Sequence, residues 1–148
     1  MISRNNWLLI AGSLSIAAAL LHLACIAGGP AWYRAVGAPE PLIGALERGN
    51  PALAYITAGI AVILAIWGAY AFAGAGLIRR LPLMRTALII ISAIYLARGL
   101  MIVDPQRFTE PGRSSTFMLW TSLIVLVFGL TYAIGTWRAW SALSAKKV

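Results

Sequence analysis

Apart from Arg85 at its start, Arg98 carries the one formal charge inside the long apolar stretch Leu83–Val103 of this sequence. A charge within a hydrocarbon layer is costly, so an intramembrane arginine reaches the head groups, pairs with an acid or binds a ligand. At 1.5 Å per helical residue, Arg98 lies about 9 Å from the end of its stretch near Asp104. Its guanidinium could therefore extend to the head groups, pair with Glu47 or Asp104, or hold an anionic ligand.

His22 is the only histidine, and we expect it at nearly the same depth as Arg98. Imidazole can transfer protons, form hydrogen bonds or bind a metal. A haem held by two histidines of one chain is excluded, and a metal would need acidic ligands or a second subunit. Cys25 is the only cysteine, which excludes a disulfide framework or a CxxC redox pair within one chain. With no phosphate-binding glycine motif or HExxH motif either, we assign no catalytic residue, metal or cofactor.

Aromatic residues are expected at the level of His22 and Arg98. Tyr95 precedes Arg98 by three residues and shares its helix face. Aromatic residues also form ordinary belts at membrane interfaces. An apolar cavity with a few polar groups at one end suits an amphiphile, whose anionic or carbonyl head an arginine could hold. The candidate ligand-binding residues are His22, Arg98, Tyr95, Tyr55, Trp32, Tyr33, Glu47 and Trp120.

The elements that must position these residues are four apolar stretches, Trp7–Gly28, Pro51–Leu77, Leu83–Val103 and Phe117–Trp137. Each is long enough for the ~20 residues with which a helix crosses ~30 Å of hydrocarbon. With 148 residues, 61% of them hydrophobic, we expect a single transmembrane domain and no separate soluble domain. We predict an all-α membrane protein, an antiparallel bundle of four transmembrane helices. The first stretch is too long for a typical signal peptide, and we interpret it as a retained helix.

The connections carry further signals. In the first loop, Leu42, Ile43 and Leu46 lie between Pro41 and Gly49, which predicts a short helix in the membrane interface. Asn50 followed by proline predicts a sharply capped start of the second spanning helix. The third loop, residues 104–116, contains two prolines and should be mostly irregular.

Small residues follow one face of the second apolar stretch, at Ala54, Ala58, Ala61, Ala65 and Gly68, opposite Ile56, Ile60, Ile63 and Trp67. Small residues let helices approach closely in lipid, so the small face should contact a neighbouring helix. Ser122, Val125, Gly129, Tyr132 and Thr136 similarly mark the inward face of the last stretch.

Charge indicates the orientation of the bundle. The N-terminus, the second loop and the C-terminal tail contain no acid but seven basic residues, Arg4, Arg79, Arg80, Arg85, Arg138, Lys146 and Lys147. Basic loops stay cytoplasmic during insertion, so we expect both termini in the cytoplasm and the first and third loops outside. The net charge of +8 is explained by topology and by attraction to anionic lipid heads, and we expect no nucleic-acid partner.

Four segments resemble small, uncharacterised four-helix inner-membrane proteins of Gram-negative bacteria: His22–Ile26, Gly29–Arg34, Gly74–Pro82 and Tyr95–Leu100. In size and layout the chain is also similar to DoxX-like proteins. The resemblance implies a bacterial inner (plasma) membrane location. It implies no activity and no site residue.

We therefore expect a multi-pass membrane protein that binds a lipid-like or quinone-like amphiphile, or a membrane partner, from the external side. Membrane lipids are the expected partners, with a homo-oligomer or another membrane protein as further possibilities. A small oligomeric transporter or channel is the first alternative, although the spans contain no acidic residue to couple ions. A membrane enzyme acting on lipid or quinone, with His22 as acid or base, is the second.

Overall fold

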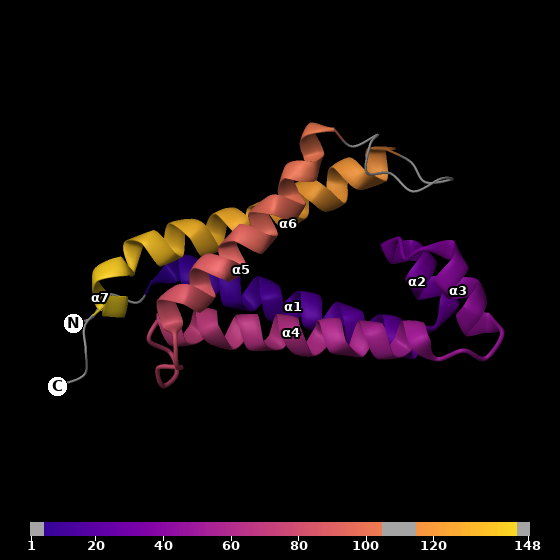
Figure 1. Cartoon of the computed structure of the whole chain (residues 1–148), viewed down its shortest axis with the longest axis horizontal. Coiled ribbons are helices and arrows are strands. Elements are labelled where there is room, and N and C mark those ends of the chain that lie inside the picture. Colours follow the sequence, from indigo (N-terminus) through magenta and orange to yellow (C-terminus); the bar gives the residue numbers. More distant parts are fainter. Residues whose placement is uncertain (1–4, 105–114, 145–148) are drawn as a thin grey trace. The chain divides into compact units, whose positions relative to one another are not determined.

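The computed structural model describes residues 5–104 and 115–144, and all regular elements in these ranges are helices (Figure 1). Four of them are long and apolar enough to cross a membrane: α1 (Asn6–Gly28), α4 (Ala52–Gly74), α5 (Met84–Gly99) continued by the 3₁₀ turn η1 (Leu100–Val103), and α6 (Ser115–Arg138). This confirms an all-α membrane protein with four spanning helices. The third loop, predicted to be irregular, lies outside the described residues over 105–114, while Ser115 and Thr116 already belong to α6.

The ends of α4 follow from local chemistry. The Asn50 side-chain oxygen accepts a hydrogen bond from the Ala52 N–H at 3.0 Å, which confirms the predicted cap. At the other end, Gly76 adopts φ +77° and its N–H bonds the carbonyl of Ala73, while the N–H of Leu77 bonds the carbonyl of Phe72. This pair of bonds is a Schellman motif, which ends the helix at Gly74, three residues before the predicted Leu77.

The chain clusters into two compact units. Unit 1 comprises Met1–Leu14 and Trp67–Val148, and unit 2 comprises Ser15–Ile66. Unit 1 therefore contains parts of all four spanning helices, and unit 2 contains the first loop with the adjoining parts of α1 and α4. The single-domain organisation stays a prediction.

In unit 1 the four spanning helices meet around Leu8, a fully buried residue of α1. A Cβ added to Gly135 of α6 would lie 2.7 Å from Leu8 Cγ. One added to Gly74 of α4 would lie 2.8 Å from Leu8 Cδ1 and 3.1 Å from Leu88 Cδ1 of α5. Real Cβ atoms do not fit at such distances, so glycines are what let these helices pack together.

Helices α5 and α6 form an extensive contact in unit 1 and lie against each other in Figure 1. A Cβ on Gly99 would lie 2.7 Å from the Cα of Leu126, and one on Gly129 would lie 2.9 Å from the backbone nitrogen of Leu96. The two backbones are thus almost in contact at two levels. The inward face predicted for this last helix is confirmed, because Ser122, Gly129, Tyr132 and Thr136 are all buried.

Unit 2 is organised around a buried cluster of Cys25, Tyr33, Ile43 and Leu53. The short helix predicted in the first loop is present as α3 (Glu40–Glu47), and its place in the membrane interface stays a prediction. A second short helix, α2 (Pro30–Val36), was not predicted. Its start has a recognisable signal, because Gly29 at φ +68° turns the chain and a proline occupies the first helical position.

The small-residue face predicted for the second spanning helix is confirmed at Ala61 and Gly68, whereas Trp67, predicted on the opposite face, is half-buried and packs its ring against Tyr95. Ala61 and Gly68 of α4 are buried, whereas Ile56, Ile60 and Ile63 are exposed on the isolated chain. Exposed isoleucines on a spanning helix face lipid or another subunit. Within unit 1, a Cβ on Gly12 of α1 would lie 3.1 Å from the Gly68 carbonyl oxygen, so the small face is where α1 crosses α4.

Candidate functional site

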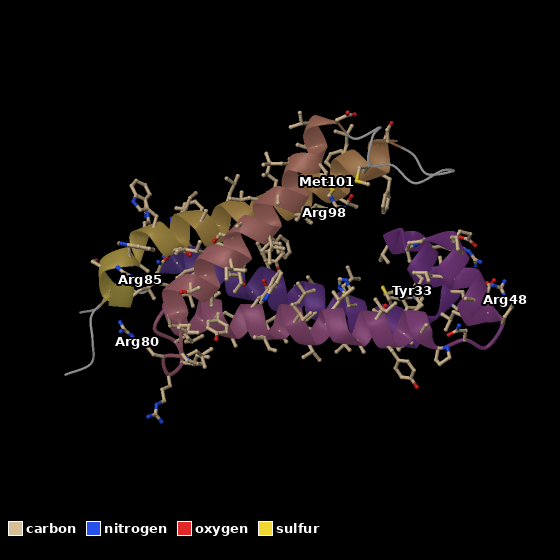
Figure 2. All side chains as sticks on the ribbon, viewed as in Figure 1. Tyr33, Arg48, Arg80, Arg85, Arg98 and Met101 are labelled. Carbon is tan, nitrogen blue, oxygen red and sulfur yellow. The ribbon has the colours of Figure 1, made fainter. Side chains whose placement is uncertain are left out.

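Arg98 of α5 is directed at the neighbouring spanning helix (Figure 2). Its Nη1 donates a hydrogen bond of 3.0 Å to the hydroxyl oxygen of Ser122, a residue of α6 that is 0% exposed. The contact is possible because Gly99, the next residue along α5, lets the backbone of α6 come close at Leu126. Arg98 is thus half-buried between two helices. A side chain that only extended to the head groups would not need such a contact with the protein.

The partner of Arg98 is neutral. A guanidinium offers five N–H donors and forms its strongest bonds with carboxylate or phosphate oxygens. Within residues 5–104 and 115–144, the hydrogen bond to Ser122 is the one that the structure gives Arg98. Among the described residues the side chain therefore retains free donors and meets no acid, which is costly within a spanning segment.

Tyr95, the other candidate on this face, is part of an aromatic cluster. Its ring centroid lies 5.0 Å from Trp67 in an edge-to-face arrangement, 5.3 Å from Phe128 and 5.4 Å from Tyr132. Such distances are typical of stabilising aromatic pairs. Tyr95 is buried, so packing within unit 1 accounts for its ring, and a role toward a ligand stays a prediction.

Three aromatic candidates are exposed on the isolated chain: Trp120 of α6, Trp32 of α2 and Tyr55 of α4. Tyr55 is the most exposed, at 73%. The ring of Trp32 lies against Gly28, where a Cβ has no room. Exposure at these positions suits an aromatic belt at the membrane interface, the other interpretation that their sequence allows.

Tyr33 differs from these aromatic residues because it belongs to the core of unit 2. It is 2% exposed and packs with Cys25, Ile43 and Leu53. Its hydroxyl is buried and has no hydrogen-bond partner among the described residues. A buried hydroxyl without a partner costs free energy, which makes Tyr33 a better candidate for contact with a bound molecule than its neighbour Trp32.

His22 is half-buried on α1, and its Nδ1 lies 2.7 Å from the carbonyl oxygen of Ala18 in the preceding turn. A carbonyl only accepts, so this bond places the hydrogen of the neutral ring on Nδ1 and leaves Nε2 as the acceptor. Such a ring can accept a hydrogen bond from a ligand hydroxyl. No three His, Cys, Asp or Glu side chains gather into a metal-binding group in the part of the chain that the structure describes.

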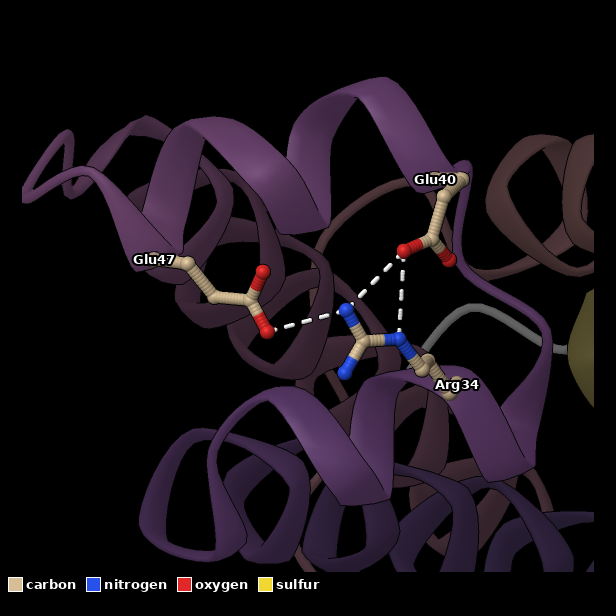
Figure 3. Close-up of polar contacts among 3 residues, drawn as sticks. All are labelled: Arg34, Glu40 and Glu47. Carbon is tan, nitrogen blue, oxygen red and sulfur yellow. Dashed lines mark hydrogen bonds and ion pairs between the residues drawn. The ribbon is translucent and has the colours of Figure 1, made fainter.

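Glu47 is bound within the first loop (Figure 3). Its carboxylate accepts a 2.9 Å hydrogen bond from Arg34 Nη2, and Arg34 also donates to Glu40 at 2.9 and 3.1 Å. The hydrogen bonds that Arg34 donates, first to Glu40 and second to Glu47, raise the pKa of its guanidinium above its usual value. This exposed network ties α2 to α3, and it occupies the carboxylate that the sequence offered as a partner for Arg98.

The candidate residues divide between the two units. Arg98, Tyr95 and Trp120 belong to unit 1, and His22, Trp32, Tyr33, Glu47 and Tyr55 belong to unit 2. One pocket formed by all eight stays a prediction. Ser122 was predicted to face inward, but its hydrogen bond with Arg98 was not predicted. The two residues are 24 positions apart on different helices, and the sequence alone does not show that they lie at the same level.

No protein-family model, curated protein or solved structure matches this chain significantly. Its function must therefore be argued from its own side chains.

Proposed function

We propose that this protein binds an amphiphile in the membrane, with the anionic or carbonyl head of that molecule at Arg98. Membrane insertion by four spanning helices supplies the setting. The observation that carries the proposal is the half-buried guanidinium of Arg98, hydrogen-bonded to the neutral hydroxyl of Ser122. A lipid or quinone head would supply the charged or carbonyl acceptor oxygens that the described residues do not offer this arginine.

Unit 2, taken by itself, offers two further polar groups that could contact a membrane molecule. The Tyr33 hydroxyl is buried without a partner among the described residues, and the Nε2 of His22 is left as an acceptor. Both lie on elements that we expect on the external side, together with Arg98. The proposed location is thus the external leaflet of a bacterial inner membrane, with the tail of the ligand between spanning helices.

The test is the ligand content of Arg98 variants purified in mild detergent. Arg98→Ala should lower the co-purified lipid or quinone per protein by about tenfold, because a charge-assisted hydrogen bond contributes about 1.5–3 kcal/mol. Arg98→Lys should also lower it several-fold, since an ammonium cannot reproduce the planar fork of donors. Mass spectrometry of the extracted molecules gives both numbers.

Arg48→Lys is the matched control, because Arg48 is exposed just after α3 and outside the spanning helices. It should leave ligand content and melting temperature unchanged. Wild-type ligand content in both Arg98 variants would mean that Arg98 only extends to the head groups, and the proposal would then fail.

A further inference from the structure

A groove opens on unit 1 along the middle of α5, from Ile89 to Leu96. It has a volume of about 550 Å³ and is lined mainly by apolar side chains of α5, the end of α6 and α7 (Trp140–Ser144). The lining residues are Ile89, Ser92, Ala93, Leu96, Ala133, Thr136, Trp137 and Trp140. Its size falls in the usual range for small-molecule sites, and most of its length lies within the spanning segments.

One polar group among the residues that line the groove lacks a partner within the described part of the chain. Thr136 is 6% exposed, and its hydroxyl forms no hydrogen bond within the described residues. Ser92, the other hydroxyl in the lining, instead donates to the Leu88 carbonyl at 2.6 Å. Buried hydroxyls normally form a hydrogen bond. The Thr136 hydroxyl could therefore donate one to an acceptor oxygen of a bound molecule.

An arginine lies at the basic end of the groove. Arg85 is one helical turn before Ile89, and its guanidinium carbon lies 4.1 Å from the ring centroid of Trp140, a lining residue. Its Nη2 donates to the Trp140 carbonyl at 3.1 Å, whereas its Nε is buried without a partner among the described residues. The stacked indole and the backbone bond hold the guanidinium in place.

The surroundings of Arg85 are basic. Arg79 and Arg80 lie in the preceding turn, and Arg80 donates to the Ala142 carbonyl of α7. Arg138 lies at the end of α6, with its guanidinium 5.9 Å from the Trp7 ring. No Asp or Glu occurs in the sequence between Glu47 and Asp104 or after Glu110, so none lies on α4, α5, α6 or α7. This end of the bundle therefore favours an anionic head group.

We infer that the groove binds one anionic phospholipid, with its phosphate at Arg85, an ester carbonyl accepting from Thr136 and an acyl chain along Ile89, Ala93 and Leu96. Phospholipid combines the three complementary parts in one molecule: negative charge, carbonyl acceptors and a hydrocarbon tail. A second copy of this chain would offer no carboxylate from its own spanning helices. This site is separate from Arg98 and does not depend on the proposal made for it.

The experiment titrates the delipidated full chain, in detergent micelles, with phosphatidylglycerol or with phosphatidylcholine. Native mass spectrometry measures bound lipid, and thermal unfolding measures the stabilisation. Wild type should prefer phosphatidylglycerol by about tenfold, because both lipids offer a phosphate but the cationic choline of phosphatidylcholine is repelled by the basic residues around Arg85, at about 1 kcal/mol per basic residue. Arg85→Gln should remove this preference. Equal affinity of wild type for the two lipids, or an unchanged preference in Arg85→Gln, would overturn the inference.

Two variants keep the test decisive if Arg85→Gln folds poorly. Thr136→Val preserves shape and removes a hydroxyl that has no protein partner, so the lipid-free protein should melt at the same or a higher temperature while its affinity for phosphatidylglycerol falls several-fold. Ala93→Phe should fill the groove and weaken the binding of both lipids, whereas Ala97→Phe, exposed one turn further along α5, should not. Wild-type lipid binding in Thr136→Val and Ala93→Phe would contradict the site. Loss of a dimer in Ala93→Phe with unchanged lipid binding would identify the groove as a contact between copies.

Discussion

Hydroxyl groups within the spanning helices mostly bond the backbone of their own helix. Thr57 donates to the Leu53 carbonyl at 2.7 Å, Ser92 to Leu88 at 2.6 Å and Thr131 to Phe128 at 2.8 Å. This is the least costly arrangement where no water is present. Ser122, which accepts from Arg98, and Thr136, which has no partner among the described residues, depart from it. Both residues lie near an arginine. Ser122 bonds Arg98 directly, and Thr136 lies four residues before Trp140, on which Arg85 stacks.

Tyr33→Phe tests whether the buried hydroxyl in unit 2 contributes to stability. Removing a hydroxyl that has no partner should leave the melting temperature in detergent unchanged or raise it, since an unsatisfied buried group costs about 1–3 kcal/mol. Tyr33→Ala, which also removes the ring from the cluster with Ile43 and Leu53, should lower it clearly. A marked loss of stability in Tyr33→Phe would show that the hydroxyl has a partner, and the lipid content of the variant would show whether that partner is a ligand.

Among the elements, the spanning helices were largely predictable and their contacts were not. Hydropathy indicated all four, because apolar length is set by membrane thickness and needs no tertiary information. Helix α3 followed from its apolar residues and flanking signals, whereas α2 and α7 are too short for a periodic pattern and were missed. The close approach of Gly99 to Leu126 depends on how two helices cross, which one helix pattern does not specify.

The candidate site shows the same division at the level of single residues. Arg98 could be selected from its type and depth alone. Its hydrogen bond to Ser122, the ion pair of Glu47 with Arg34 and the burial of Tyr33 depend on packing between elements. Thr136 was predicted to face inward, yet only the fold shows that it lines a groove with Trp140.

Gly129→Ala tests the contact between α5 and α6. The new Cβ would lie 2.9 Å from the Leu96 backbone nitrogen, so one helix must move, at a cost of about 1–3 kcal/mol. The unfolding temperature of the purified protein should fall. Gly59→Ala in α4 is the control, because nothing lies within 4 Å of its Cβ and alanine favours the helix. Equal unfolding temperatures for the two variants would show that the helices do not approach as described.

On the scale of the whole molecule, the four spans separate segments that carry only basic residues from two loops in which arginines and acids balance. The positive-inside rule predicts that the turn containing Arg79 and Arg85 is cytoplasmic, as is the end after Val148. Reporter fusions at these positions should report a cytoplasmic location, and fusions at Ala45 and Glu110 an external one. A cytoplasmic signal at Ala45 would contradict the predicted orientation and would move Arg98 to the inner leaflet.

The central claim is that Arg98 holds the head of an amphiphile, and an experimental structure of the full chain in lipid nanodiscs tests it most directly. The account predicts non-protein density within hydrogen-bond distance of the Arg98 guanidinium, with the Ser122 bond retained and a tail extending between spanning helices. The same density should be absent in Arg98→Ala. A guanidinium that instead pairs with a carboxylate of this chain, or that contacts only water at the membrane surface, would contradict the claim.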